Sequence, residues 1–164
     1  MITLRGVESK DLMRFYEILQ NPNVYTKIDL ETAPSMKDEY QWYQSIQINE
    51  ELVWTIEYDG IIVGNCRIFS ELDFPENSGE FGIIIDEKYW GRGIGTFVCK
   101  WLITFADEQL RLEQLFLEVK KSNHHAKRLY QKLGFQTMKI LPEHERMVIL
   151  FPHNKDVKKD EKSD

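Results

Sequence analysis

Seven segments of the chain read as β-strands: the first alternates between apolar and polar residues, and others, such as 80–85, are runs of apolar residues typical of buried strands. These segments are residues 2–7, 52–58, 61–69, 80–85, 112–119, 135–141 and 146–151. Between them, apolar residues recur at helical spacing in four segments. The first follows Ser9, the second follows Ser35, the third runs from Gly93 to about Leu110, and the fourth begins at Asn123. The order β-α-α-β-β-β-α-β-α-β-β predicts an α/β fold with a mixed sheet.

Turn and cap residues support these boundaries. Ser9 and Ser35 are good N-caps, and Asp38 three residues after Ser35 comes close to a capping box. Asp59-Gly60 between two strand patterns predicts a tight hairpin turn. The proline-punctuated segment 21–34 reads mainly as a loop.

The chain has 164 residues, 42% of them hydrophobic and 29% charged, which is typical of a single globular domain. We expect this domain to span residues 1–152, followed by a charged, disordered tail at 153–164. No apolar run approaches the ~18 residues needed to cross a bilayer, and the first residues have no signal-peptide pattern. Cys66 and Cys99 form no disulfide framework or metal cluster, so we expect a cytoplasmic protein without a metal.

The formal net charge of −6 argues against nucleic acid as a partner, because phosphate binding needs clustered lysines and arginines. The same charge suits a cationic ligand, although many proteins are acidic for solubility alone.

The stretch YWGRGIGT places Gly91, Gly93 and Gly95 between a predicted strand and a predicted helix. The N-terminus of a helix has unpaired N–H groups that attract phosphate, and glycines let ligand oxygens approach the backbone. Arg92 could add a charge-assisted hydrogen bond. A Walker A loop is absent, and a dinucleotide-binding fingerprint would need its third glycine at Thr96. From spacing alone, a phosphate cradle and a tight turn with close packing both remain open.

Two sequence blocks resemble the GNAT N-acetyltransferase superfamily. G-R-G-I-G-T resembles its coenzyme A loop, and NHHAKRLYQKLGF resembles its Asn-x-x-Ala-x-x-x-Tyr-x-x-x-Gly-Phe segment, about thirty residues later. The resemblance is strongest over residues 80–135, and KDEYQWYQSI resembles the branch that includes ribosomal-protein and spermidine N-acetyltransferases. Trp90 stands where Gln or Arg is usual, which removes one side-chain donor from the loop.

The resemblance implies a mixed, mostly antiparallel sheet of about seven strands flanked by about four helices, with a splayed pair of strands holding acetyl-CoA. The pyrophosphate would lie on Gly91, Arg92, Gly93, Ile94, Gly95 and Thr96. The backbone of Ile83, Ile84 and Ile85 would pair with the pantetheine arm, and a bulge near Gly82 could separate this strand from strand 112–119.

The resemblance also suggests catalytic roles. Asn123 and Tyr130 are two helical turns apart and share a face, so Asn123 would meet the pantetheine or cap its helix and Tyr130 would meet the thioester sulfur. Because Tyr titrates near ~10 and a thiol near ~8.5, Tyr130 is better suited to a hydrogen bond than to full proton transfer. Glu80 is the candidate general base. A core aromatic at Tyr130 and an exposed strand-edge glutamate at Glu80 are the structural alternatives.

The expected reaction is direct transfer of an acetyl group from acetyl-CoA to a small-molecule or peptide amine. Segment 21–50 carries Asp29, Glu31, Asp38, Glu39 and Glu50 against two lysines, which suits a polyamine, an aminoglycoside or a protein N-terminus. Tyr40, Trp42 and Tyr43 could wall the acceptor pocket. Three alternatives remain open. The acceptor could be an amino sugar, the chain could be a catalytically silent acetyl-CoA-binding module, and the acids of segment 21–50 could simply be exposed to solvent. Strands within 136–152 offer an edge for a homodimer, which the sequence does not decide.

Overall fold

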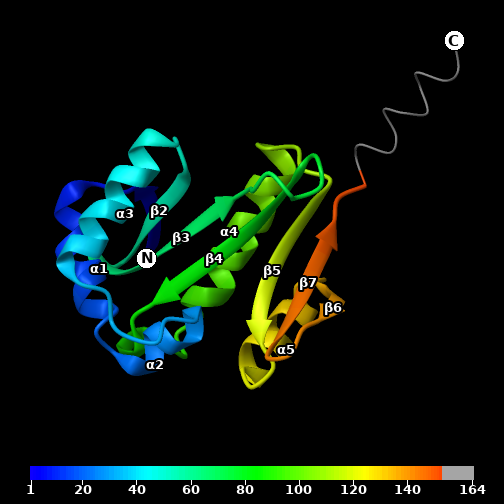
Figure 1. The fold of residues 1–164 in the computed structure, drawn as a ribbon. Coiled ribbons are helices and arrows are strands. Elements are labelled where there is room, and N and C mark those ends of the chain that lie inside the picture. The colour runs from blue at the N-terminus through cyan, green and yellow to red at the C-terminus, as the bar shows by residue number, and fades with distance from the viewer. Residues whose placement is uncertain (153–164) are drawn as a thin grey trace, which may run out of the picture. The chain divides into compact units, whose positions relative to one another are not determined.

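A computed structural model describes residues 1–152, and the order of its elements follows the predicted order with one addition (Figure 1). Within these residues there is a seven-stranded sheet in the order β1-β2-β3-β4-β5-β7-β6, together with five α-helices. The predicted mixed, mostly antiparallel sheet is therefore confirmed. The tail predicted at 153–164 lies outside the described residues.

The described chain divides into two compact units. The first unit contains Met1–Ile68 and Gly82–Val98, and the second contains Phe69–Phe81 and residues 99–152. β4 (Ser78–Ile85) and α4 (Ile94–Glu108) each contribute residues to both units. The single domain expected for 1–152 stays a prediction.

In the first unit, β1 (Ile2–Gly6) pairs antiparallel with β2 (Leu52–Tyr58), which pairs antiparallel with β3 (Ile61–Phe69). The β2–β3 turn has positive φ at both central residues, 49° at Asp59 and 79° at Gly60. This is the geometry of a primed turn, whose twist matches that of the strands. The hairpin predicted from Asp-Gly is thus confirmed.

The first helical segment begins earlier than the Ser9 cap predicts. Glu8 caps a 3-10 turn, η1 (Ser9–Asp11), through a capping box with Asp11, and α1 (Leu12–Ile18) continues from it. The cap is an acid one residue before the predicted serine, because Glu8 adopts the extended backbone that an N-cap requires.

The second predicted helix is α3 (Met36–Ile48), and its capping box between Ser35 and Asp38 is confirmed. α1 and α3 pack against each other, with the rings of Phe15 and Trp42 edge to face at 6.0 Å (Figure 1). This contact sets the side of α3 that faces the interior of the first unit.

The segment read mainly as a loop contains the additional helix. α2 (Pro22–Tyr25) is a single turn, followed by the 3-10 turn η2 (Thr26–Ile28). The Asn21 side chain accepts a hydrogen bond from the Asn23 N–H at 2.9 Å, and Pro22 occupies the first helical position. Proline is favourable there, because that N–H would have no partner in the helix. Pro22, one of the two prolines that suggested a loop, therefore starts a helix here.

A buried carboxylate fixes η1 to the sheet. Asp11 is fully buried and accepts two hydrogen bonds from Arg5, at 2.8 and 2.9 Å, and one from Thr55 Oγ1 at 2.8 Å. Burial acts to raise the pKa of Asp11, but these bonds and one from the Glu8 N–H outweigh it, so its pKa is lowered. Asp11 is therefore ionised at neutral pH.

In the second unit, β5 (Gln114–Lys120) pairs antiparallel with β7 (His144–Leu150), and β7 with β6 (Gln136–Ile140) (Figure 1). β4 pairs parallel with β5 over three residues, from Ser78 opposite Gln114 to Glu80 opposite Phe116. α5 (His124–Lys132) lies between β5 and β6 in sequence. It ends before Gly134, whose φ of +105° matches the predicted glycine C-cap.

Candidate active site

The glycine-rich turn lies between β4 and α4, as predicted. After Ile85 the chain forms a 3-10 turn, η3 (Glu87–Tyr89), in which the Asp86 side chain accepts a hydrogen bond from the Lys88 N–H at 3.1 Å. Trp90 Nε1 donates to the Ile85 carbonyl oxygen at 2.9 Å. Trp90, which departs from the usual loop pattern, therefore connects the turn to the end of β4 by a hydrogen bond.

The backbone of this turn is open where a phosphate would need to approach. Gly91 and Gly93 have φ of +76° and +79°, and a Cβ at either would meet no atom within 4 Å. A Cβ at Gly95 would meet only Ile85 Cδ1, at 3.7 Å. The Phe97 N–H donates to the Gly93 carbonyl at 3.1 Å, so the N–H groups that precede it in α4 have no intrahelical acceptor. Open space and free N–H groups at a helix N-terminus fit a pyrophosphate.

Two cations lie over aromatic rings beside the turn. The Arg92 guanidinium carbon is 4.9 Å from the centre of the Tyr89 ring and 5.9 Å from that of Tyr58. Lys27 Nζ is 3.9 Å from the centre of the Trp90 ring. These cation–π contacts hold positive charge near the turn and so favour an anionic ligand.

β3 and β4 approach each other closely at one glycine. A Cβ on Gly64 would lie 1.9 Å from the Ile84 carbonyl oxygen, a distance that no side chain could occupy. The Asp86 N–H donates to the Val63 carbonyl at 2.8 Å, just beyond this point. Gly64 is therefore required by the position of the Ile84 backbone.

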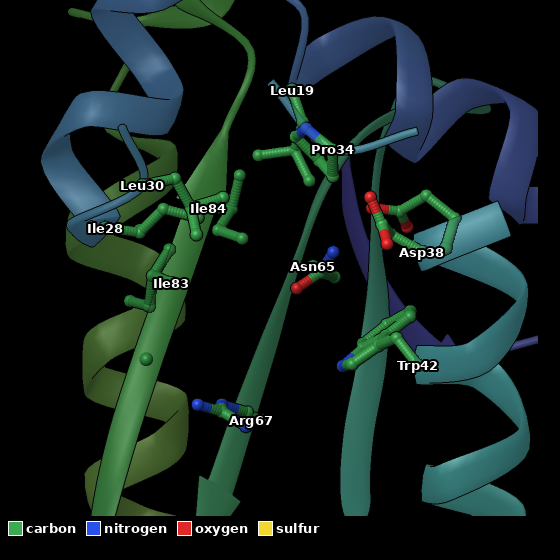
Figure 2. A pocket seen from close by; sticks show the side chains of 12 residues that line it. Leu19, Ile28, Leu30, Pro34, Asp38, Trp42, Asn65, Arg67, Ile83 and Ile84 are labelled. Atoms are coloured by element: carbon green, nitrogen blue, oxygen red, sulfur yellow. The ribbon is translucent and has the colours of Figure 1, made fainter. Parts of the chain in front are cut away.

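A pocket of about 390 Å³ lies in the first unit between α3, β3 and β4 (Figure 2). Its apolar lining consists of Leu19, Ile28, Leu30, Pro34, Ile83 and Ile84. Its polar lining consists of Asp38, Glu39, Asn65 and Arg67, and Trp42 and Gly82 complete it. Figure 2 shows Asn65 in the middle of the lining and Arg67 at the end away from Pro34 and Asp38.

Two neighbouring acids of this pocket differ in their environment. Asp38 is exposed, and the hydrogen bonds that it accepts from the Ser35 N–H and Oγ lower its pKa. Glu39 is only 5% exposed, and burial, with a smaller contribution from the charge of Asp38, raises its pKa to about 7. No hydrogen bond or ion pair to the Glu39 carboxylate is found among residues 1–152.

In the second unit, Tyr130 lies in an aromatic cluster. Its ring is edge to face with Phe81 at 5.9 Å and with Phe135 at 6.0 Å. Burial, and to a lesser extent the neighbouring Cys99, raises the pKa of Tyr130. Cys99 itself has a pKa raised to about 12 by burial, so it is no nucleophile at neutral pH.

Asn123 is the N-cap of α5, and its Oδ1 accepts a hydrogen bond from the Ala126 N–H at 3.3 Å. Asn123 was considered for contact with the pantetheine or for capping its helix, and in the structure it caps the helix.

Glu80 lies in a network of charges in the second unit. Arg146 Nη2 donates to Glu80 Oε1 at 3.3 Å, and Arg146 Nε lies 3.7 Å from Glu118 Oε1. The guanidinium also lies over the rings of Phe74 and Phe116, at 5.4 and 5.2 Å. Burial and the charge of Glu118 raise the pKa of Glu80, while Arg146 acts in the opposite direction. Glu80 is thus a half-buried carboxylate with a partner, and not a fully exposed strand-edge residue.

The first unit brings together part of the predicted site. Ile83 and Ile84 line the pocket, and the segment from Gly91 to Thr96 belongs to the same unit. Of the aromatic residues proposed for the pocket wall, Trp42 lines it, whereas Tyr40 is 55% exposed.

Two polar lining residues, Asn65 and Arg67, were not singled out from the sequence. Asn65 and Arg67 lie within a strand pattern that gave no sign of a pocket. Glu39 was only one of several local acids, but its spacing from Trp42 and Ile46 places it on the apolar face of a helix, and that signal could have been read.

Comparison with known proteins agrees with this geometry. The family model of the acetyltransferase (GNAT) domain matches residues 1–136. The chain is 29% identical over 137 residues to spermidine N(1)-acetyltransferase of Escherichia coli K12, covering 82% of this chain and 72% of the relative. It is 36% identical over 84 residues to spermine/spermidine N(1)-acetyltransferase of Bacillus subtilis 168, covering 48% of this chain and 55% of the relative.

The fold is similar to that of a crystal structure of Vibrio cholerae spermidine N-acetyltransferase in complex with CoA and spermine. The TM-score is 0.82 at 24% identity, covering 91% of this chain and 95% of the other. At that level of identity the similarity establishes the fold.

Within 1–152 no helix combines the length and apolar character needed to cross a membrane. In the same residues no three His, Cys, Asp or Glu side chains gather into a group that could hold a metal ion.

Proposed function

The chain belongs to the acetyltransferase (GNAT) family and is an N-acetyltransferase, and from this premise we propose that it moves the acetyl group of acetyl-CoA to a primary amine of a polyamine. The observation that carries the acceptor class is the pocket of the first unit. It combines an apolar lining with the two carboxylates Asp38 and Glu39. An aliphatic polycation has the complementary character, since its methylene groups need apolar contacts and its ammonium groups need carboxylates.

The names of the relatives support this choice. The proteins of Escherichia coli and Bacillus subtilis to which the chain is similar are both described as polyamine N(1)-acetyltransferases. An aminoglycoside, a protein N-terminus and an amino sugar are the acceptors against which the proposal must be tested.

For the donor, we propose that the turn from Gly91 to Thr96 binds the pyrophosphate of acetyl-CoA. The open backbone at Gly91 and Gly93 and the adjoining N-terminus of α4 support this assignment. The backbone of Ile83, Ile84 and Ile85 would pair with the pantetheine arm, a role that needs β4 and β5 to separate beyond their last registered pair, Glu80–Phe116.

The reaction requires the acceptor nitrogen to lose a proton before it attacks. At pH 7 this deprotonation costs about 4.6 kcal/mol for an amine with a pKa of ~10.4. Glu80 is the proposed proton acceptor, directly or through water, and its half-buried position and raised pKa suit that role. The neutral amine then adds to the thioester carbonyl carbon, and a backbone N–H near Ile85 would stabilise the oxyanion.

Collapse of the tetrahedral intermediate breaks the C–S bond, and the extra proton on the amine nitrogen passes to the departing thiolate, directly or through water. We propose that the Tyr130 hydroxyl donates a hydrogen bond to this sulfur as its charge develops. Because burial raises the pKa of Tyr130, a hydrogen bond suits it better than full proton transfer. Cys99 takes no part, since its raised pKa keeps it protonated.

The proposal is tested by following free-thiol release from acetyl-CoA with spermidine, an aminoglycoside, an amino sugar and a peptide with a free N-terminus. Turnover with spermidine at a kcat/KM well above that of the other acceptors is expected. Preferential turnover of another acceptor would overturn the polyamine assignment. If acetyl-CoA failed to raise the melting temperature, the assignment of the glycine turn would be wrong as well.

A further inference from the structure

Glu39 is an acid on the inward-facing side of a helix. It lies three residues before Trp42 and seven before Ile46, so the three side chains share one face of α3. Trp42 packs on Phe15, and Ile46 is buried in the core. Glu39 is 5% exposed and lines the pocket, and no group among the described residues bonds to its carboxylate. A buried carboxylate without a partner that faces a cavity is unusual, because buried charges are normally paired.

The charged groups around this carboxylate are few. On α3 its neighbour is Asp38, which is ionised and carries the same sign. From β3, Arg67 and the neutral amide of Asn65 enter the lining. Arg67 lies beside Gly82, where its Cγ and Nε are 3.8 Å from the position of a Cβ, at the end of the lining away from Asp38 (Figure 2). Asp38 and Arg67 thus lie toward different ends of the pocket.

We propose, building on the function proposed above, that Glu39 selects a cationic acceptor, and that an ammonium group of the acceptor enters this pocket in exchange for a proton on Glu39. In the empty pocket the carboxyl group keeps its proton up to a higher pH than usual, because burial and the charge of Asp38 both disfavour its ionised form. An ammonium group reverses this balance, since it gives the carboxylate the partner that the protein does not supply. The proton leaves to solvent, and a charge-assisted hydrogen bond replaces it.

The exchange makes acceptor binding depend on pH in a defined direction. With a pKa of about 7 in the empty pocket, Glu39 is mostly protonated at pH 6 and mostly ionised at pH 8. Binding of the cation therefore releases close to one proton from Glu39 at pH 6 and almost none at pH 8. The affinity for a cation falls by roughly tenfold between pH 8 and pH 6 through this group alone.

The pocket should also discriminate between acceptors. A polyamine can place an ammonium group at Glu39. An acceptor with a neutral group at that position leaves the carboxyl group protonated, so it gains no binding free energy from an ion pair with Glu39.

The test is calorimetric binding of spermidine to the full-length protein, in the presence of CoA to prevent turnover, for the native chain and for Glu39→Gln. Glu31→Gln is the matched control, because Glu31 is an exposed acid in the same segment and does not line the pocket. At pH 8 we expect Glu39→Gln to raise the Kd by about 10- to 100-fold, which is the range for a lost hydrogen bond between charged groups. The ratio of the Kd of Glu39→Gln to that of the native protein should fall about tenfold from pH 8 to pH 6. Glu31→Gln should change the Kd less than threefold at both pH values.

Titrations in buffers of different ionisation enthalpy count the protons directly. The native protein should release close to one proton more than Glu39→Gln at pH 6, and the difference should vanish by pH 8. Equal Kd values for the two proteins at pH 8, or no difference in proton release at pH 6, would overturn the inference. So would the absence of any spermidine binding by the native protein.

Thiol release by the native protein separates this inference from the proposed function. If spermidine is acetylated but Glu39→Gln binds it as the native protein does, the function stands and the role of Glu39 is wrong. If the binding and proton counts follow the prediction but no acetyl group is transferred to spermidine, the inference stands and the acceptor assignment is wrong.

Discussion

The raised pKa of Glu39 predicts that Glu39→Gln makes the protein more stable, and more so at alkaline pH. In the folded protein the pKa rises from 4.5 to about 7, so between these values the folded state binds more protons than the unfolded state. Stability then falls as the pH rises through this window, because the slope of the unfolding free energy follows the difference in bound protons. Glutamine keeps the shape of the side chain and has no charge to bury.

At about 1.36 kcal/mol for each pKa unit, the full effect is at most about 3 kcal/mol, and the part between pH 5 and pH 8 is about 2 to 3 kcal/mol. Urea unfolding of both proteins across this range should therefore show that the advantage of Glu39→Gln grows by up to that amount. Glu31→Gln, which removes an exposed acid, should follow the native curve to within about 0.5 kcal/mol. An advantage that stayed constant with pH, or that shrank as the pH rose, would show that Glu39 is not a buried carboxyl group with a raised pKa.

Three further predictions test other parts of the structure. Gly64→Ala should lower the free energy of unfolding in urea by about 1–3 kcal/mol or more, because the new Cβ would collide with the Ile84 carbonyl. Gly6→Ala is the control and should have a much smaller effect, because a Cβ at Gly6 meets no atom within 4 Å. Asp11→Ala should lower the unfolding free energy at pH 7 by about 3–5 kcal/mol, since it removes the buried carboxylate that Arg5 and Thr55 share and leaves Arg5 with Glu57 as its remaining acidic partner. A loss below about 1 kcal/mol would contradict the network. Tyr130→Phe should lower kcat about 100-fold while the Kd for acetyl-CoA changes little, and loss of acetyl-CoA binding instead would refute the proposed role.

Much of the fold could be predicted from the sequence because its signals are local. The hairpin between β2 and β3 follows from Asp59-Gly60, whose backbone angles only a few residues adopt easily. The glycine turn could be predicted for the same reason, since Gly91 and Gly93 both have positive φ. In α2 the same reasoning was misleading, because a proline such as Pro22 can end an element or begin one.

The acceptor pocket was harder to predict, because its lining comes from segments that are distant in sequence. Arg67 fits the strand pattern of β3 and gives no local sign of a pocket. Only the pairing of strands brings it beside Gly82. The raised pKa of Glu39 depends on how deeply α3 packs, which the acidity of the local segment does not reveal. Glu80 illustrates the same limit, since its partner Arg146 lies 66 residues away.

We propose that this chain acetylates a polyamine with acetyl-CoA as donor. The most direct measurement is mass spectrometry of spermidine after incubation with the protein and isotopically labelled acetyl-CoA, with free thiol measured in parallel. We expect one labelled acetyl group on a primary nitrogen of spermidine for each thiol released. Thiol release without labelled spermidine, or no reaction while another amine is acetylated, would contradict it.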